Sequence, residues 1–259
     1  MANQSTQEVI EELKKLLSEK GDLDCEVQGK IERLIAELKW PGPVGPHFVD
    51  PAVKRIFDGF NRFKTCKFDK NPELFAELAK GQHPKFLVFA CSDSRVSPSH
   101  ILDFQPGEAF MARNIANMVP EFDKIRYSGV GAVIEYAVGS LEVRNILVIG
   151  HSKCGGIQRL MTHPEDGSNE FDFIDDWVRI GLPAKEKVLS ENPNLSLEEQ
   201  LKLCEKESVK NSVRNLWSYP YVKKAVLDGN LKLWGGYYDF VHGKFELLED
   251  AHALPVVPF

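Results

Sequence analysis

The stretch of sequence that decides the fold is KFLVFACSDSR, residues 85–95, in which an apolar run ends directly at a cysteine. A second stretch, NILVIGHSKCGG at residues 145–156, repeats this arrangement, with an apolar run that ends beside a histidine and another cysteine. Short runs of β-branched and aromatic residues predict buried strands. In open α/β sheets, ligands bind at the carboxyl ends of the strands. We therefore expect two parallel strands whose ends bring their polar residues to one site.

Three potential metal ligands follow these strands: Cys91 after the first, and His151 and Cys154 after the second. Thiolate and imidazole suit zinc, and three protein ligands leave a fourth tetrahedral position open, as in catalytic zinc sites. Cys154 also precedes a predicted helix, whose N-terminus favours a thiolate. On its own, His-x-x-Cys is equally compatible with a buried cysteine beside an unrelated histidine. Gly155 and the glycine after it predict a close backbone approach at this turn.

Asp93 and Arg95 stand two residues apart in the first stretch. They can form a bidentate ion pair just outside the metal ligands, with one carboxylate oxygen left to accept a hydrogen bond from metal-bound water. The alternative is a surface salt bridge worth less than about 1 kcal/mol. The gap between Cys91 and Arg95 is too short for a phosphatase cradle, so we exclude that function.

Around these stretches the chain divides into three parts. Residues 1–40 predict an N-terminal arm of two amphipathic helices, the first opened by a capping box at Ser5. Residues 41–50 are rich in proline and glycine and predict a linker. Residues 51–259 predict a zinc-binding α/β catalytic domain.

Alternating strand and helix patterns define the expected architecture of this domain. The fold class is α/β, with a central, mainly parallel β-sheet flanked by helices and a C-terminal strand that runs into a hairpin. The expected strands cover residues 85–90, 108–114, 145–149, 231–240 and 245–248. The expected helices cover residues 51–65, 72–80, 127–141 and most of 171–216, the last with a capping box at Ser196.

Composition narrows the function classes. The 259 residues are 43% hydrophobic and 27% charged, which is ordinary for a globular protein. The net charge of −6 does not indicate the positively charged surface that nucleic-acid binding requires. No apolar run reaches the roughly 20 residues of a membrane span. We therefore expect neither nucleic-acid binding nor membrane insertion.

Two features of the sequence bear on the compartment. The first residues have neither a secretion signal nor an arginine-rich transit segment. Five dispersed cysteines argue against a disulfide framework and for a reducing environment. We expect a cytoplasmic protein, or a chloroplast stromal one whose transit peptide has been removed.

Ordered motifs extend over roughly residues 50 to 250. They are CSDSR at 91–95, PSH at 98–100, DFQPGEAF at 103–110, RNIANMVP at 113–120, EYAV at 135–138, GHS at 150–152, CGG at 154–156, IGLPAK at 180–185, CEKE at 204–207 and GGYYDF at 235–240. In these motifs the sequence closely resembles the plant-type β-class carbonic anhydrases. The resemblance implies reversible hydration of CO2 to bicarbonate and a proton, with one Zn2+ per subunit.

The same resemblance implies roles for individual residues at the metal. Cys91, His151 and Cys154 would hold zinc, with water or hydroxide as the fourth ligand. Asp93 would orient that hydroxide, and Arg95 would keep Asp93 away from the metal.

The resemblance also implies a substrate pocket. Gln82 would hydrogen-bond bicarbonate through its side-chain amide, and the backbone of Gly155 would lie beside the substrate. The apolar CO2 pocket would be lined by residues that the neighbouring subunit contributes, namely Phe110, Ile115 and Tyr136. The obligate unit would be a homodimer, and plant relatives often assemble such dimers into octamers.

Three features depart from the family pattern. Ser97 stands where plant relatives commonly have a cysteine, Lys153 replaces a usually small residue between two ligands, and the tail after Leu248 differs from the usual endings.

Other functions compete with CO2 hydration. The alternatives are a CS2 or COS hydrolase on the same scaffold and a non-catalytic ligand-binding or signalling protein. A structural zinc module is disfavoured because spacing suggests no fourth protein ligand.

Overall fold

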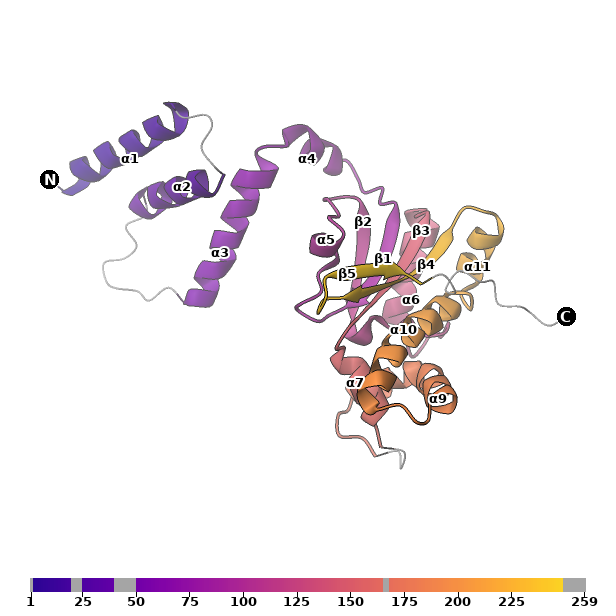
Figure 1. Ribbon diagram of the computed structural model, residues 1–259. Helices are drawn as coiled ribbons and strands as arrows, with labels where there is room; N and C mark the ends of the chain where they lie inside the picture. The colour runs from indigo at the N-terminus through magenta and orange to yellow at the C-terminus, as the bar shows by residue number, and fades with distance from the viewer. Residues whose placement is uncertain (1, 20–24, 40–49, 165–167, 249–259) are drawn as a thin grey trace. The chain divides into compact units, whose positions relative to one another are not determined.

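The computed structural model describes residues 2–19, 25–39, 50–164 and 168–248 (Figure 1). The chain forms two compact units, residues 1–81 and 82–259. The sequence instead places the start of the catalytic domain at residue 51, and that boundary stays a prediction. The predicted linker, apart from Asp50, and the tail after Leu248 lie outside the described residues.

The first unit is helical. Its elements are α1 (Ala2–Glu19), α2 (Cys25–Lys39), α3 (Pro51–Phe63), the π-helical turn η1 (Lys64–Phe68) and α4 (Pro72–Leu78). Because α1 begins at Ala2, the predicted helix start at Ser5 is wrong. Asp50 caps α3 by accepting a hydrogen bond from the backbone N–H of Ala52 at 2.7 Å. Cys66 in η1 is disulfide-bonded, a bond that the sequence did not predict.

The second unit is built on a five-stranded sheet. Its strands are β1 (Phe86–Cys91), β2 (Ala109–Asn114), β3 (Asn145–His151), β4 (Lys232–Asp239) and β5 (Lys244–Leu247). The order is β2-β1-β3-β4-β5, with parallel pairing throughout except for the antiparallel pair of β4 and β5. The predicted α/β class, with a mainly parallel sheet and a C-terminal hairpin, is confirmed.

Helices surround this sheet. They are α5 (Pro98–Ile101), η2 (Ile115–Asn117), α6 (Ser128–Glu135), η3 (Tyr136–Ser140), α7 (Gly155–Thr162), α8 (Ile174–Val178), η4 (Arg179–Gly181), α9 (Leu182–Glu191), α10 (Leu197–Leu216) and α11 (Pro220–Leu227). The capping box at Ser196 is present, and its hydroxyl accepts a hydrogen bond from the backbone N–H of Glu199. The helix predicted over 127–141 ends in a π-helical turn, η3.

Strand register places the ends of β1 and β3 side by side. Leu87 and Phe89 point into a core formed with helices α6, α10 and α11, whereas the alternate residues Val88 and Ala90 belong to a separate cluster. Ala90 pairs with Ile149 across the parallel ladder. The next residues of both strands therefore emerge at the same edge, where the two stretches that decide the fold meet.

Helix α10 packs closely on the end of β3 because position 150 is a glycine. A Cβ at Gly150 would lie 2.5 Å from Cγ2 of Val209 and 3.2 Å from the carbonyl oxygen of Glu205. Any larger residue would push the helix away from the strand end that carries His151.

Candidate metal centre

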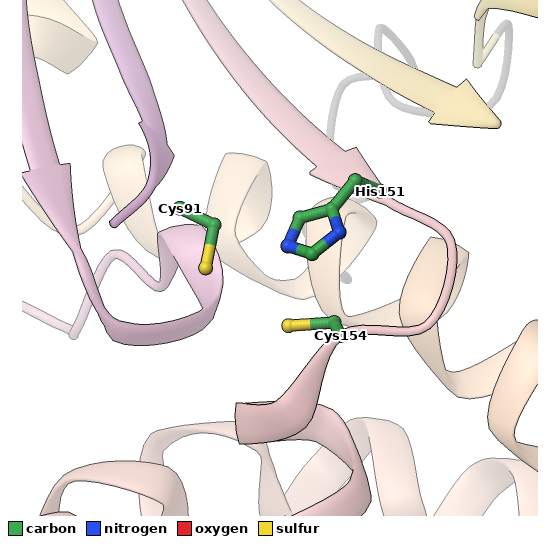
Figure 2. A group of neighbouring side chains, drawn as sticks. All are labelled: Cys91, His151 and Cys154. Atoms are coloured by element: carbon green, nitrogen blue, oxygen red, sulfur yellow. The ribbon is translucent and has the colours of Figure 1, made fainter. Parts of the chain in front are cut away.

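Cys91, His151 and Cys154 converge at the carboxyl edge of the sheet. Cys91 ends β1, His151 ends β3, and Cys154 is the cap residue of α7. One potential ligand atom from each residue lies within 4.8 Å of the other two. Figure 2 shows the three side chains pointing toward one another. All three are buried, with exposed fractions of 5%, 1% and 3%. The convergence predicted from the strand ends is therefore present.

The imidazole of His151 is oriented for metal binding. Its Nδ1 lies 2.9 Å from the carbonyl oxygen of Ser152, and since a carbonyl can only accept, Nδ1 carries the proton. Its Nε2 is buried and has no hydrogen-bond partner among the residues that the structure describes. A histidine ligand commonly donates its other N–H to such an acceptor. The free lone pair on Nε2 fits a metal ion.

The two thiols fit the same ion. The hydrogen bond with Cys154 lowers the pKa of Cys91, and the same bond raises the pKa of Cys154. One thiolate therefore forms readily, while the second thiol serves as its hydrogen-bond donor. Both can ionise together only when a cation compensates the two negative charges in this buried space. The donor set of two sulfurs and one imidazole nitrogen matches zinc chemistry.

Asp93 and Arg95 form the expected bidentate pair. Arg95 donates from Nε to Oδ1 at 2.9 Å and from Nη2 to Oδ2 at 2.6 Å, and its backbone N–H also donates to Oδ1 at 2.9 Å. The bonds from Arg95 lower the pKa of Asp93 to about 2. Oδ1 thus accepts two hydrogen bonds and Oδ2 only one. Asp93 is held as a carboxylate, and Oδ2 keeps a lone pair for a further donor.

Two residues beyond the predicted set support this pair. Arg113 on β2 donates from Nε to the carbonyl of Cys91 at 2.6 Å and from Nη2 to the carbonyl of Asp93 at 3.0 Å. Phe240 stacks under the Arg95 guanidinium, 4.4 Å from ring centroid to Cζ. They fix the backbone and the guanidinium on which the position of the Asp93 carboxylate depends.

Lys153 links the pair to the metal ligands. Its backbone is left-handed, with φ of 54°, which costs a non-glycine residue about 1 kcal/mol. Its carbonyl oxygen accepts a hydrogen bond from Nη2 of Arg95 at 3.1 Å. Its ammonium is exposed and pairs with Glu198 on α10 at 2.9 Å. The side chain forms an ion pair on the surface, and the backbone contacts Arg95 of the Asp93–Arg95 pair.

Two of the five predicted substrate residues lie close to the metal ligands. Gly155 is the first residue of α7, directly after Cys154. Ile115 follows β2 and packs on the next glycine, Gly156, where a Cβ would meet Cγ2 of Ile115 at 2.9 Å. Ile115 also lines a cavity of about 510 Å³ that reaches Ser92, the residue after Cys91. The close backbone approach predicted for the two glycines occurs at Gly156, whereas Gly155 faces open space.

The other three predicted substrate residues lie away from the metal ligands of the same chain. Phe110 pairs with Leu87 near the start of β1 and packs against Tyr136, with ring centroids 5.7 Å apart. Phe110 lies four residue steps, about 13 Å, before the end of β2 at Asn114. Gln82 is exposed in the loop that precedes β1, at the opposite end of that strand from Cys91. Within one chain, these residues and the metal ligands form two separate groups.

Comparison with known proteins shows which family the chain belongs to. Residues 86–245 match the sequence model of the carbonic anhydrase family. The chain is 49% identical over 250 residues to beta carbonic anhydrase 3 of Arabidopsis thaliana, covering 96% of this chain and 95% of that protein. The chain belongs to the plant-type β-carbonic anhydrases. It is therefore a carbonate dehydratase, which catalyses the reversible hydration of CO2.

Solved structures of β-carbonic anhydrases have the same fold. The β-carbonic anhydrase CcaA superimposes with a TM-score of 0.71 at 28% identity, covering 79% of this chain and 99% of that one. A tetrameric β-carbonic anhydrase from Sordaria macrospora gives 0.69 at 29% identity, covering 77% of this chain and 98% of the other. Both matches span nearly the whole of the compared protein.

Some residues that shape the site in this carbonic anhydrase were not predicted as site residues. Arg113, Phe240 and Glu205 stand in the motifs RNIANMVP, GGYYDF and CEKE, but a motif does not show what its members contact. Glu205 is 4% exposed, and its Oε1 accepts a hydrogen bond from the backbone N–H of Cys154 at 3.2 Å. A buried acidic residue at helical spacing could have signalled this role, since buried carboxylates require partners.

Proposed function

We propose that Cys91, His151 and Cys154 hold one zinc ion and that this centre carries out the hydration of CO2 to bicarbonate and a proton. The observation that carries the proposal is the convergence of two buried thiols on a histidine whose buried Nε2 has no hydrogen-bond partner within the described part of the chain. A bound zinc ion supplies a Lewis acid that lowers the pKa of water from about 15.7 to about 7, an effect best known from three-histidine carbonic anhydrases.

The chain's own residues then orient the reacting water. Asp93 accepts a hydrogen bond from it through the lone pair that Arg95 leaves on Oδ2. Because Asp93 cannot donate while it is ionised, the water must direct a lone pair elsewhere, toward CO2. Arg95 holds the carboxylate in a bidentate grip, so that Asp93 remains a hydrogen-bond acceptor and does not become a fourth metal ligand.

We further propose that the working unit is a homodimer in which each chain completes the pocket of its partner. Gln82, Phe110 and Tyr136 lie far from the ligands of their own chain, which supports a role at the partner's centre. Gly155 would serve the centre of its own chain. Ile115, which the resemblance assigns to the pocket of the neighbouring subunit, packs on Gly156 of its own chain, and its assignment stays a prediction. A tetrameric relative supports association, and the octamer remains a further proposal.

The compartment and domain boundaries follow the sequence. We propose that the enzyme works in the cytoplasm or the chloroplast stroma, and that residues 1–40 form an arm joined by a linker at 41–50 to the catalytic region. Among the described residues, no helix is long and apolar enough to cross a membrane.

The decisive experiment is stopped-flow CO2 hydration on purified protein whose metal content is measured. We expect about one zinc per chain and rapid hydration, and loss of both in Cys154→Ser. Ser97→Ala is the matched control, because this serine lies near β1 without belonging to the ligand set. Wild-type protein that binds zinc fully yet hydrates CO2 no faster than Cys154→Ser would overturn the proposal.

The same preparation tests the alternatives. The presence of all three ligands and of Asp93 does not favour a non-catalytic protein, and family membership does not favour a CS2 or COS hydrolase. Turnover of CS2 or COS at a rate above that of CO2 would reverse this judgement.

A further inference from the structure

Both polar groups of the peptide bond between Lys153 and Cys154, its carbonyl oxygen and its N–H, form hydrogen bonds with side chains. On one side, the Lys153 carbonyl accepts from Nη2 of Arg95 at 3.1 Å. On the other, the Cys154 N–H donates to Oε1 of Glu205 at 3.2 Å. A peptide unit is planar, so hydrogen bonds in opposite directions fix its rotation. This plane leads directly into the Cα of Cys154, whose sulfur belongs to the metal site.

Glu205 is anchored by the surrounding structure. It lies on α10, where its backbone passes close to Gly150 of β3. Its Oε2 accepts a hydrogen bond from the Tyr237 hydroxyl at 2.7 Å, and Tyr237 on β4 is paired with Gly150 in the sheet. The Glu205 carboxylate therefore joins helix α10, strand β4 and the metal loop, by which we mean residues 152–154 between β3 and α7.

The conformation of the loop requires such support. Lys153 is left-handed, and a strained non-glycine backbone persists only where neighbouring groups hold it. Burial raises the pKa of Glu205, while the Tyr237 hydroxyl and the N–H groups of Cys154 and Lys153 act in the opposite direction. No arginine or lysine forms an ion pair with Glu205 within the described part of the chain. Its stabilising partners are thus the tyrosine hydroxyl and the loop itself.

We propose that Glu205, oriented by Tyr237, is a positioning residue that clamps the Lys153–Cys154 peptide against Arg95 and so holds the Cys154 sulfur in place for the metal. The clamp rests on the proposed function, because it presumes that Cys154 is a ligand. It also joins the two parts of the centre: Arg95, which holds Asp93, is the other half of the clamp.

Zinc affinity tests the clamp independently of catalysis. The dissociation constant for Zn2+ is measured on the full chain by competition with a chromophoric chelator, and the Co2+-substituted protein reports ligand geometry by its visible spectrum. We expect Glu205→Ala to weaken Zn2+ binding by about 10- to 100-fold and to shift the Co2+ bands. Glu205→Gln retains an oxygen acceptor for the Cys154 N–H, so its affinity should fall by less than about tenfold.

The matched control is Glu207→Ala on the same helix. Glu207 is also a buried carboxylate, but it pairs with Lys187 at 3.1 Å and Arg214 at 2.9 Å, away from the metal loop. Its loss should lower thermal stability and leave Zn2+ affinity unchanged. If Glu207→Ala weakens zinc binding as much as Glu205→Ala, or if Glu205→Ala binds zinc like the wild type, the clamp is overturned.

Two further variants keep the outcomes separable. Tyr237→Phe preserves the Glu205 carboxylate and removes the hydroxyl that orients it, so we expect a few-fold loss of Zn2+ affinity. If both the affinity and the Co2+ spectrum of Tyr237→Phe are unchanged, the clamp is contradicted, even if Glu205→Ala does not fold. Cys154→Ser tests the ligand assignment. If Cys154→Ser binds zinc with wild-type affinity, the proposed function itself is refuted. If Cys154→Ser loses zinc affinity but Glu205→Ala does not, only the positioning role of Glu205 is refuted.

Discussion

The two ends of the paired strands β1 and β2 carry different groups of proposed site residues. At the carboxyl end, Cys91 meets His151 and Cys154, all buried and within 4.8 Å, with Asp93 and Arg95 paired beside them. At the amino end, Phe110 pairs with Leu87 and packs against Tyr136, which is 46% exposed. One chain thus brings the three proposed ligands together but leaves the proposed pocket residues apart from them, so we expect metal binding and the CO2 pocket to be supplied by different subunits.

Mixing two inactive variants tests that separation and should give the largest effect. One variant carries Cys154→Ser, and the other carries Phe110→Ala with Tyr136→Ala. If pockets are completed by the partner, a mixed dimer has one intact centre. Random 1:1 reassembly should restore about one quarter of wild-type CO2 hydration, because half of the dimers are mixed and each has one working centre of two.

The control for this experiment is a mixture of Cys154→Ser with His151→Ala, which damages the metal site of every chain and should stay inactive. Absence of recovery in the test mixture after verified subunit exchange would show that each pocket belongs to its own chain. Recovery by the control would show that mixing restores activity without an intact metal site, and recovery in the test mixture would then not support a shared pocket.

Asp93→Asn probes the carboxyl end alone and should have a smaller effect. Asparagine keeps one oxygen acceptor but loses the charge that makes the bidentate grip of Arg95 strong. We expect kcat/KM to fall by about 100-fold, with zinc content unchanged. This is the lower end of the range for losing a proton-transfer group, because Asp93 orients the water by a hydrogen bond and does not take its proton. Asp123→Asn is the matched control, since Asp123 likewise accepts from the N–H two residues later, that of Ile125 at 2.8 Å. An equal loss in both variants would remove Asp93 from the reaction.

The smallest expected effect is on the pH dependence of kcat/KM. Because Arg95 lowers the pKa of Asp93 to about 2, the carboxylate stays ionised as pH falls, until the pH approaches that value. The kcat/KM profile between about pH 5 and 9 should therefore show no acid limb that belongs to Asp93. Arg95→Gln should return this pKa toward the ordinary value of about 3.9, which lowers the profile without changing its shape above pH 5. An acid limb near pH 6 that vanishes in Asp93→Asn would contradict the assignment.

Much of the sheet could be predicted because its signals are local. The strands at 85–90 and 145–149 are uninterrupted apolar runs, and the structure differs from the prediction by one or two residues at their ends. The start of α1 was missed because a capping box at Ser5 is only a short-range preference, which a longer helix overrides. The disulfide of Cys66 was missed because pairing depends on a distant partner, which spacing does not reveal.

By itself, the sequence determined the α/β class, the three candidate ligands and the Asp93–Arg95 pair, because each depends on residue types and on local patterns: apolar runs that end at a ligand, or two residues of opposite charge close together in the chain. Only the tertiary structure decided that Glu205 and Arg95 hold opposite sides of one peptide and that Phe110 and Tyr136 lie apart from the ligands of their own chain. Those facts depend on strand register and on how α10 packs at Gly150. Such contacts join residues tens of positions apart, and no local pattern encodes the distance between them.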